Sequence, residues 1–177
     1  MDMVSVTIGV VGVLSTVVLG LVAQRLSSTN QRYQARRTIG DLHSSMAHLR
    51  CEYPAIKTVC AHWDDLHSRR MYDDADPVAQ ALLVRYEAYV DIGLEFCNTA
   101  LGARAKGVLH KDDFVHQYQP LVRLFVAENW PFIRHALGNP YLSAFVRREI
   151  QAREAAGFDW QAAHLDITAL PASMPAS

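Results

Sequence analysis

The chain has 177 residues, of which half are hydrophobic and a fifth are charged, and its formal net charge at pH 7 is −1. This composition is typical of a folded protein and excludes a largely disordered one. A net charge near zero also argues against nucleic acid as an obligate partner, because affinity for a phosphate backbone depends on clustered cations.

The first segment, residues 3–23, carries no charge and is rich in valine and leucine. At about 1.5 Å of rise per residue, a helix of this length spans a hydrocarbon layer about 30 Å thick, so we predict a transmembrane helix. A cleaved signal peptide is one alternative, but Asp2 precedes the apolar run and the sequence LVAQR fits a small-x-small cleavage site poorly. A buried helix of a soluble domain is the other.

Charges on either side of this segment predict its orientation. One acidic residue, Asp2, precedes it, whereas arginines crowd its other end. Because positive charge stays on the cytoplasmic side, we expect a single-pass protein of the inner membrane with its N-terminus outside and its C-terminal domain in the cytoplasm. The same arginines are predicted to contact lipid headgroups. They are Arg25, Arg32, Arg36 and Arg37.

Small residues recur three or four positions apart along the predicted span, which places them on one face of the helix. They are Ser5, Gly9, Gly12, Thr16, Gly20 and Ala23. Small faces let the backbones of membrane helices approach closely, so we expect a homo-oligomer or a pairing with another membrane protein. The alternative is a passive anchor whose glycines have no partner.

The residues after the predicted span indicate an all-α protein, with a cytoplasmic bundle of about five helices after the single membrane helix. We expect a basic juxtamembrane helix in residues 24–54, a helical bundle in residues 55–156 and a flexible Pro/Ala/Ser-rich tail in residues 157–177. The helices are predicted at residues 30–53, 56–70, 76–104, 112–133 and 139–155. Pro120 and Pro131 should kink or break the fourth, and Asn139–Pro140 should begin the fifth.

Three helices show inward faces. The first is a heptad-like seam at Ala35, Ile39, Leu42, Met46, Leu49 and Tyr53. The second is the stripe of Leu82, Tyr86, Tyr89, Val90, Gly93, Phe96, Cys97 and Ala100, in a helix that Gly107 should end. Inward positions of the next helix are Phe114, Tyr118, Leu121, Val122, Phe125 and Ile133.

Few residues are spaced as catalytic or metal-binding groups require. The three cysteines, Cys51, Cys60 and Cys97, have no metal-binding spacing and are expected to be reduced, buried thiols. His62, Asp65 and His67 share a helix, and Asp112 and His116 are four apart, but neither set completes a coordination shell, so no metal and no cofactor is expected. Glu87, Asp91 and Glu95 form a stripe that we interpret as a solvated face, or as one that bridges to Arg147, Arg148 or Arg153.

Residues 85–146 resemble uncharacterised bacterial single-span membrane proteins with a helical cytoplasmic domain. The resemblance rests on Tyr86–Glu87, on Gly107 before an acidic helix start, on Trp130 followed by Arg134, and on the Asn139–Pro140–Tyr141 sequence. It implies a membrane-anchored helical module and supplies no reaction or catalytic residues.

An Arg-x5-His pattern occurs at Arg104…His110 and at Arg37…His43. In helical RNases of the HEPN type, an Arg-x4–6-His motif places a cation and a general acid/base beside the scissile phosphate. Chance alone supplies about two such pairs in a chain with this many arginines and histidines. Arg104 and His110 are therefore weak catalytic candidates, and Gly107 between them indicates a helix end rather than an intact catalytic turn.

We therefore predict a membrane-anchored, non-enzymatic helical module that oligomerises through its span or recruits a protein partner at the cytoplasmic face. The alternative is a membrane effector of a phage-defence system, either a HEPN-like nuclease or a protein resembling the pore-forming accessory proteins of RNA-targeting CRISPR systems.

Overall fold

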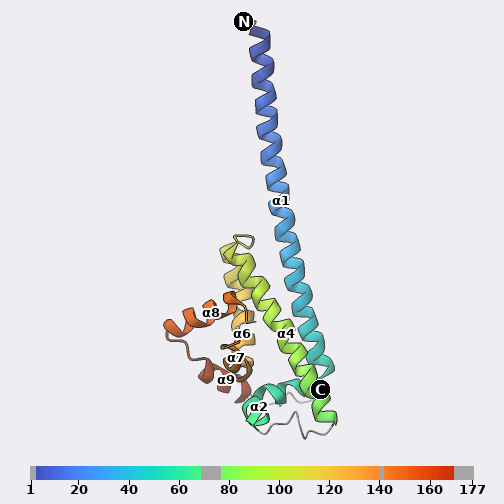
Figure 1. Ribbon diagram of the computed structural model, residues 1–177, viewed down its shortest axis with the longest axis vertical. Coiled ribbons are helices and arrows are strands. Elements are labelled where there is room, and N and C mark those ends of the chain that lie inside the picture. Colours follow the sequence, from blue (N-terminus) through green and yellow to red (C-terminus); the bar gives the residue numbers. More distant parts are fainter. Residues whose placement is uncertain (1–2, 69–76, 140–141, 170–177) are drawn as a thin grey trace.

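The computed structural model describes the backbone of residues 3–68, 77–139 and 142–169; the description excludes the side chains of residues 3–18, 62, 64–68, 78, 79 and 169. These ranges are helical and contain no strand, which confirms the all-α class. Helix α1 (Met3–Glu52) has 50 residues and is therefore about 75 Å long. Its N-terminal half stands clear of the other helices (Figure 1).

The other helices lie on one side of the C-terminal part of α1 (Figure 1). They are α2 (Ile56–Ser68), α4 (Pro77–Ala105), α5 (Lys111–Asp113), the π-helical segment η1 (Phe114–Tyr118), α6 (Gln119–Glu128), α7 (Trp130–Ala136), α8 (Ala144–Ala155) and α9 (Trp160–Ala169). Of these, α4 lies alongside α1, with α6, α7, α8 and α9 on its other side (Figure 1).

The heptad-like seam of α1 packs on the molecule's own bundle. Ile39 and Met46 are buried, and the other seam positions are half-buried against the core. This confirms the predicted inward face. The aromatic ring of Tyr53, just after α1, is covered by the Arg85 guanidinium at 4.0 Å from the ring centroid. The predicted stripe of α4 is confirmed at Tyr86, Tyr89 and Phe96; Leu82 is half-buried against the core, and its neighbour Leu83 is buried.

Gly93 permits the closest helix contact in the core. A Cβ atom added at this position would lie 2.0 Å from Cε2 of Phe125 in α6. Because no carbon atoms approach that closely without displacement, the hydrogen side chain of glycine is what allows the Phe125 ring to sit against α4.

The prolines divide the predicted helix of residues 112–133, as expected. Pro120 lies in the first turn of α6 and Pro131 in the first turn of α7. Proline has no N–H to donate, and before Pro120 the bonding pattern widens so that the Gln119 N–H donates to the Phe114 carbonyl. At the second break, Asn129 leaves helical geometry with φ −103° and ψ 20°.

The next helix begins later than predicted. Helix α8 begins at Ala144, not at Asn139–Pro140, because Ser143 is its N-cap and accepts a hydrogen bond from the Phe145 N–H at 3.2 Å. Asn139 instead begins a turn that is closed by the Leu142 N–H donating to its carbonyl. Pro140 itself lies outside the described residues.

The predicted flexible tail is wrong for residues 160–169, which form α9. Asp159 caps this helix by accepting hydrogen bonds from the Gln161 and Ala162 N–H groups at 2.9 and 3.0 Å. Trp160 is 2 % exposed and stacks on Trp130 with ring centroids 5.9 Å apart. Burial of this aromatic side chain holds α9 on the bundle. Residues 170–177 lie outside the described part of the chain.

Within the part of the chain whose side chains are described, no helix is long and apolar enough to cross a membrane. Residues 3–18 of the predicted span lie outside that part, although their backbone is helical.

Candidate functional site

A buried polar cluster lies where α1, α4 and the α6–α7 junction meet. The Arg50 guanidinium, near the end of α1, contacts both carboxylate oxygens of Glu128, at 2.8 and 3.0 Å. The Tyr89 hydroxyl donates to the same carboxylate at 3.3 Å. Glu128 is 6 % exposed, so this is an ion pair largely removed from water.

Two further elements join this cluster, one through Asn129, which is fully buried, and one through backbone carbonyl groups just before it. The Cys60 thiol of α2 lies 3.2 Å from the Asn129 Oδ1, and the Asn129 amide donates to the Phe125 carbonyl at 2.9 Å. From α9, the Nδ1 atom of His164 lies 3.0 and 3.1 Å from the carbonyl oxygens of Ala127 and Glu128. The cluster therefore joins α1, α2, α4, α9 and the α6–α7 junction.

The electrostatics of the cluster favour a structural role. Burial, and secondarily the Glu128 carboxylate, raise the pKa of the Cys60 thiol well above its usual range, so the thiol stays protonated. The same two causes raise the pKa of the Tyr89 hydroxyl. Burial lowers the pKa of Arg50, but the Glu128 charge and its neighbours outweigh this effect and the net shift is upward. A protonated thiol and a paired carboxylate are poor nucleophiles, so we interpret the cluster as a clamp on the end of α1.

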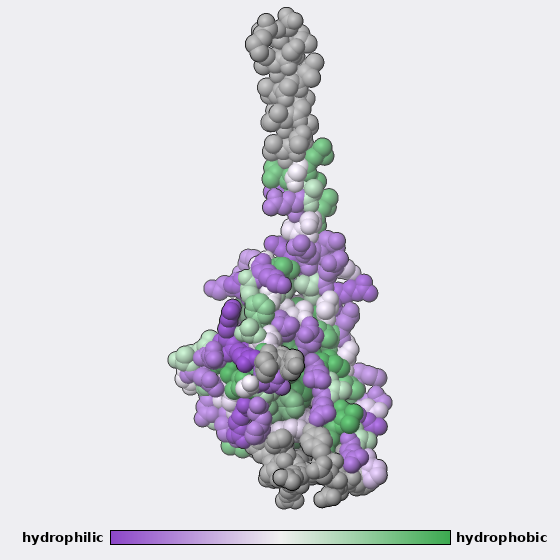
Figure 2. Space-filling view, viewed as in Figure 1, coloured by the Kyte–Doolittle hydropathy of each residue, from purple (hydrophilic) through white to green (hydrophobic). Residues whose placement is uncertain are grey.

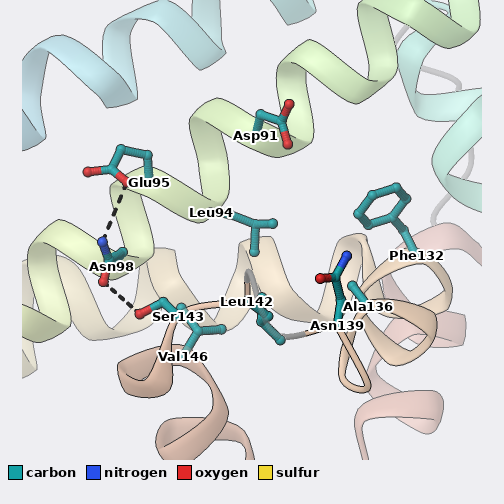
Figure 3. Close-up of a pocket in the computed structure, with 10 residues that line it drawn as sticks. All are labelled: Asp91, Leu94, Glu95, Asn98, Phe132, Ala136, Asn139, Leu142, Ser143 and Val146. Carbon is teal, nitrogen blue, oxygen red and sulfur yellow. Dashed lines mark hydrogen bonds between the residues drawn. The ribbon is translucent and has the colours of Figure 1, made fainter.

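A pocket of about 270 Å³ lies between α4, α7 and the start of α8 (Figure 3). Asp91 and Glu95 of the predicted acidic stripe line it, and both are exposed, as expected of a solvated face. Glu95 accepts hydrogen bonds from Asn98 and Thr99, at 3.4 and 3.1 Å. The Ser143 hydroxyl donates to the Asn98 amide oxygen at 2.6 Å and therefore faces an amide rather than a base. This geometry does not activate a nucleophile.

The arginines proposed to bridge to the acidic stripe have other partners. Arg147 donates hydrogen bonds to the carbonyl oxygens of Leu137, Asn139 and Leu142, which ties the α7–α8 connection to α8. Arg153 pairs with Glu149 at 2.9 Å, one turn earlier on α8. Bridging by these two residues is therefore a wrong prediction.

Arg104 and His110 lie on opposite sides of the turn that ends α4. Gly107 has φ +70°, the left-handed conformation that glycine favours, and the Val108 N–H donates back to the Ala103 carbonyl at 2.8 Å. His110 is the N-cap of α5 and accepts from the Asp112 N–H at 3.4 Å. The predicted helix end at Gly107 is confirmed, and the histidine is engaged in capping.

The arginines predicted at lipid headgroups differ in their pairing. Arg36 contacts the Asp113 carboxylate at 2.5 Å, whereas Arg37 lies 3.9 Å from Asp41 with both side chains more than two-thirds exposed. Arg25 and Arg32 are exposed on α1, with Arg25 on the part that extends from the bundle and Arg32 where the bundle begins. The structure thus brings residue 36 of α1 beside α5, a contact that no local pattern indicates.

The predicted small-residue face lies mostly outside the described side chains: Ser5, Gly9, Gly12 and Thr16. Gly20 is exposed, and a Cβ atom added there would meet no atom within 4 Å. This face has room for a neighbouring helix at Gly20.

Cys60 and Cys97 are buried thiols, as predicted, but Cys51 is exposed. Among the described residues no group of His, Cys, Asp and Glu side chains is arranged to hold a metal ion. The side chains of His62, Asp65 and His67 lie outside that description.

Sequence reasoning missed the Arg50–Glu128–Asn129 cluster. The available signal was the pair Glu128–Asn129 directly before Trp130–Pro131, since two polar residues at a proline-marked break between apolar helices need buried partners. Neither a protein-family model, nor a curated protein, nor a solved structure matches the chain.

Proposed function

We propose that the chain is a membrane-anchored helical module that associates through the N-terminal part of α1 and presents its bundle at the cytoplasmic face. The observation that carries the proposal is the exposure of apolar side chains where α1 leaves the bundle. Leu19 and Leu26 are 68 % and 67 % exposed, and Leu21 and Val22 are about half exposed. Figure 2 shows hydrophobic surface on the part of α1 that protrudes from the bundle, here called the rod, above the more hydrophilic surface of the bundle. Apolar side chains of this size are not left in water along a rigid rod without a covering partner.

The sequence N-terminal to these residues indicates what covers them. The exposed residues continue the uncharged run of residues 3–23, and Arg25 follows at its end. A bilayer covers such a run on all sides, and the arginines favour an orientation with the bundle in the cytoplasm. Within this proposal the buried clamp at Arg50 fixes the bundle to a helix that enters the membrane. The buried thiols of Cys60 and Cys97 are protonated and the Arg104–His110 pair is divided by a turn, so we favour binding over catalysis.

The anchor is tested by membrane fractionation of the full chain. The protein should remain in the pellet after alkaline carbonate extraction and dissolve only in detergent. A C-terminal reporter that is active only in the periplasm should stay silent. Release by carbonate would contradict the anchor, and strong periplasmic activity would reverse the orientation.

Association is tested by native mass spectrometry from detergent. Gly12→Leu/Gly20→Leu adds bulk to the small-residue face, so we expect the oligomer or partner complex to dissociate while insertion persists. Leucine at Gly20 meets open space within one chain, so the variant does not disturb the fold there. Gly40→Leu is the matched control, because Gly40 also faces open space but lies on α1 beyond the predicted span. A wild-type monomer with no membrane partner would show that the span is only an anchor.

A further inference from the structure

The end of α4 and the turn after it face the same way as the N-terminus of α1. In Figure 1 this yellow-green end of α4 lies at the edge of the bundle nearest the protruding rod. An open groove between the two helices shows which of their residues lie at the same position along the axis of α1. It is lined by Gln31 and Gln34 of α1 and by Lys106 after α4, and it has a volume of about 610 Å³. Lys106 therefore lies level with residues 31–34 of α1.

The charges at this edge are unevenly balanced. Lys106 and Lys111 are exposed and form no ion pair with any residue in the described ranges. Of the two carboxylates nearby, Asp113 pairs with Arg36, whereas Asp112 is exposed and lies 3.7 Å from His110, which is charged only when protonated. The groove itself is lined by amide, hydroxyl and apolar side chains with Lys106 as its charged member. This edge therefore attracts anions.

The height of this edge suits contact with a bilayer surface. If the hydrocarbon ends at residue 23, residue 31 lies about 12 Å beyond it at about 1.5 Å per residue. The headgroup layer occupies about 5–7 Å of that distance. Over residues 31–34 the remaining gap is about 5–11 Å, which is comparable to the Debye length of about 8 Å at physiological salt, so Lys106 interacts with the lipid charges. Lys111 lies further from the surface, because Asp113 in the same short helix pairs with Arg36.

We propose that the α4–α5 turn, through Lys106 and Lys111, is a second headgroup-binding surface that docks on anionic phospholipids. This inference rests on the proposed membrane anchor. The arginines of α1 then form one side of the contact and the lysines of the turn form the other. Contacts on two sides of the rod hold the bundle at one tilt, whereas contacts on α1 alone leave it free to rotate about the helix axis.

The experiment measures the distance of labelled sites from the membrane surface. The full chain is placed in nanodiscs of phosphatidylcholine with or without 30 % phosphatidylglycerol as an added probe lipid, each containing a headgroup-attached quencher. A fluorophore is attached in turn to Ser27→Cys and to His110→Cys in the Cys51→Ser chain, and to native Cys51 in the unmodified chain. Cys60 and Cys97 are buried and do not compete for the label.

The label at position 110 should be quenched at least about twofold more in discs with phosphatidylglycerol than in discs without it. Lys106→Glu/Lys111→Glu should abolish this difference. Lys57→Glu is the control, because Lys57 is also exposed but lies on α2 at the far end of the bundle. The label at Cys51 should report no change in any disc.

Equal quenching at position 110 in both discs, or quenching that persists in the double variant, would overturn the docking surface. The label at position 27 separates this result from a failure of the anchor, because strong quenching there with none at 110 shows an inserted chain without docking. Loss of the phosphatidylglycerol effect on adding about 10 mM glycerol 3-phosphate, at constant ionic strength, would identify a soluble-anion site instead and would also overturn the proposal.

Discussion

The clamp at the end of α1 gives the sharpest test of how the bundle is held to the rod. In Arg50→Ala the Glu128 carboxylate, 6 % exposed, loses both of its guanidinium contacts and keeps only the hydroxyl of Tyr89 at 3.3 Å. Removing one partner of a buried ion pair costs about 3–5 kcal/mol. We expect the lower end, about 3 kcal/mol, because the Arg50 side chain is 30 % exposed and water can replace part of the contact.

The assay is urea and thermal unfolding of the full chain in detergent, followed by tryptophan fluorescence. All three tryptophans, Trp63, Trp130 and Trp160, lie in the bundle, so the signal reports the bundle rather than the rod. At about 2–4 °C per kcal/mol for a domain of this size, Tm should fall by about 6–12 °C.

Two further variants separate a buried charge from a general loss of contacts. Arg37→Ala removes an exposed pair at 3.9 Å and should cost at most about 0.5 kcal/mol. Arg50→Met/Glu128→Leu removes both charges and should recover much of the loss, to within about 1–2 kcal/mol of wild type. If Arg50→Ala costs no more than Arg37→Ala, then Glu128 is solvated and the clamp does not exist.

Three further predictions concern packing, reactivity and catalysis. Gly93→Ala should destabilise the bundle by about 1–3 kcal/mol in urea unfolding, because the added Cβ meets the Phe125 ring. Gly40→Ala, where the added Cβ meets open space, should stabilise the protein by up to about 1 kcal/mol. Equal effects of the two substitutions would refute the close contact at Gly93. A maleimide should label Cys51 within minutes at pH 7. Cys60 and Cys97 should stay unreacted up to pH 9, because burial raises the pKa of both thiols and keeps them protonated. Mass spectrometry of the labelled peptides measures the reaction, and rapid labelling of Cys97 would contradict its burial. Arg104→Ala and His110→Ala should each retain wild-type cellular activity and partner binding, and loss of both cellular activity and RNA cleavage with the fold preserved would revive the nuclease alternative.

The amino-acid sequence alone determined the elements whose signals are local. Pro77 and Gly107 mark the ends of α4 because one presets the first helical turn and the other adopts a left-handed conformation. The period of Ile39 and Met46 identified the face of α1 that is buried, since a helix repeats its faces every 3.6 residues whatever packs on them. The same local reasoning marked Pro120, where the helix widens into a π-helical turn, and Pro131, where Asn129 leaves helical geometry.

The folded structure was needed to establish which of these helices pack together and which of their residues face each other. Arg50 and Glu128 are 78 residues apart, and no pattern near either one names the other as its partner. Helix α9 has a local cap in Asp159, but its place depends on Trp130, which lies 30 residues earlier. Lys106 lies beside the exposed stretch of α1 because α4 runs back along that helix. Contacts of this kind depend on the shapes and polar groups of surfaces brought together by folding, whereas local periodicity specifies only that each helix has a face to bury.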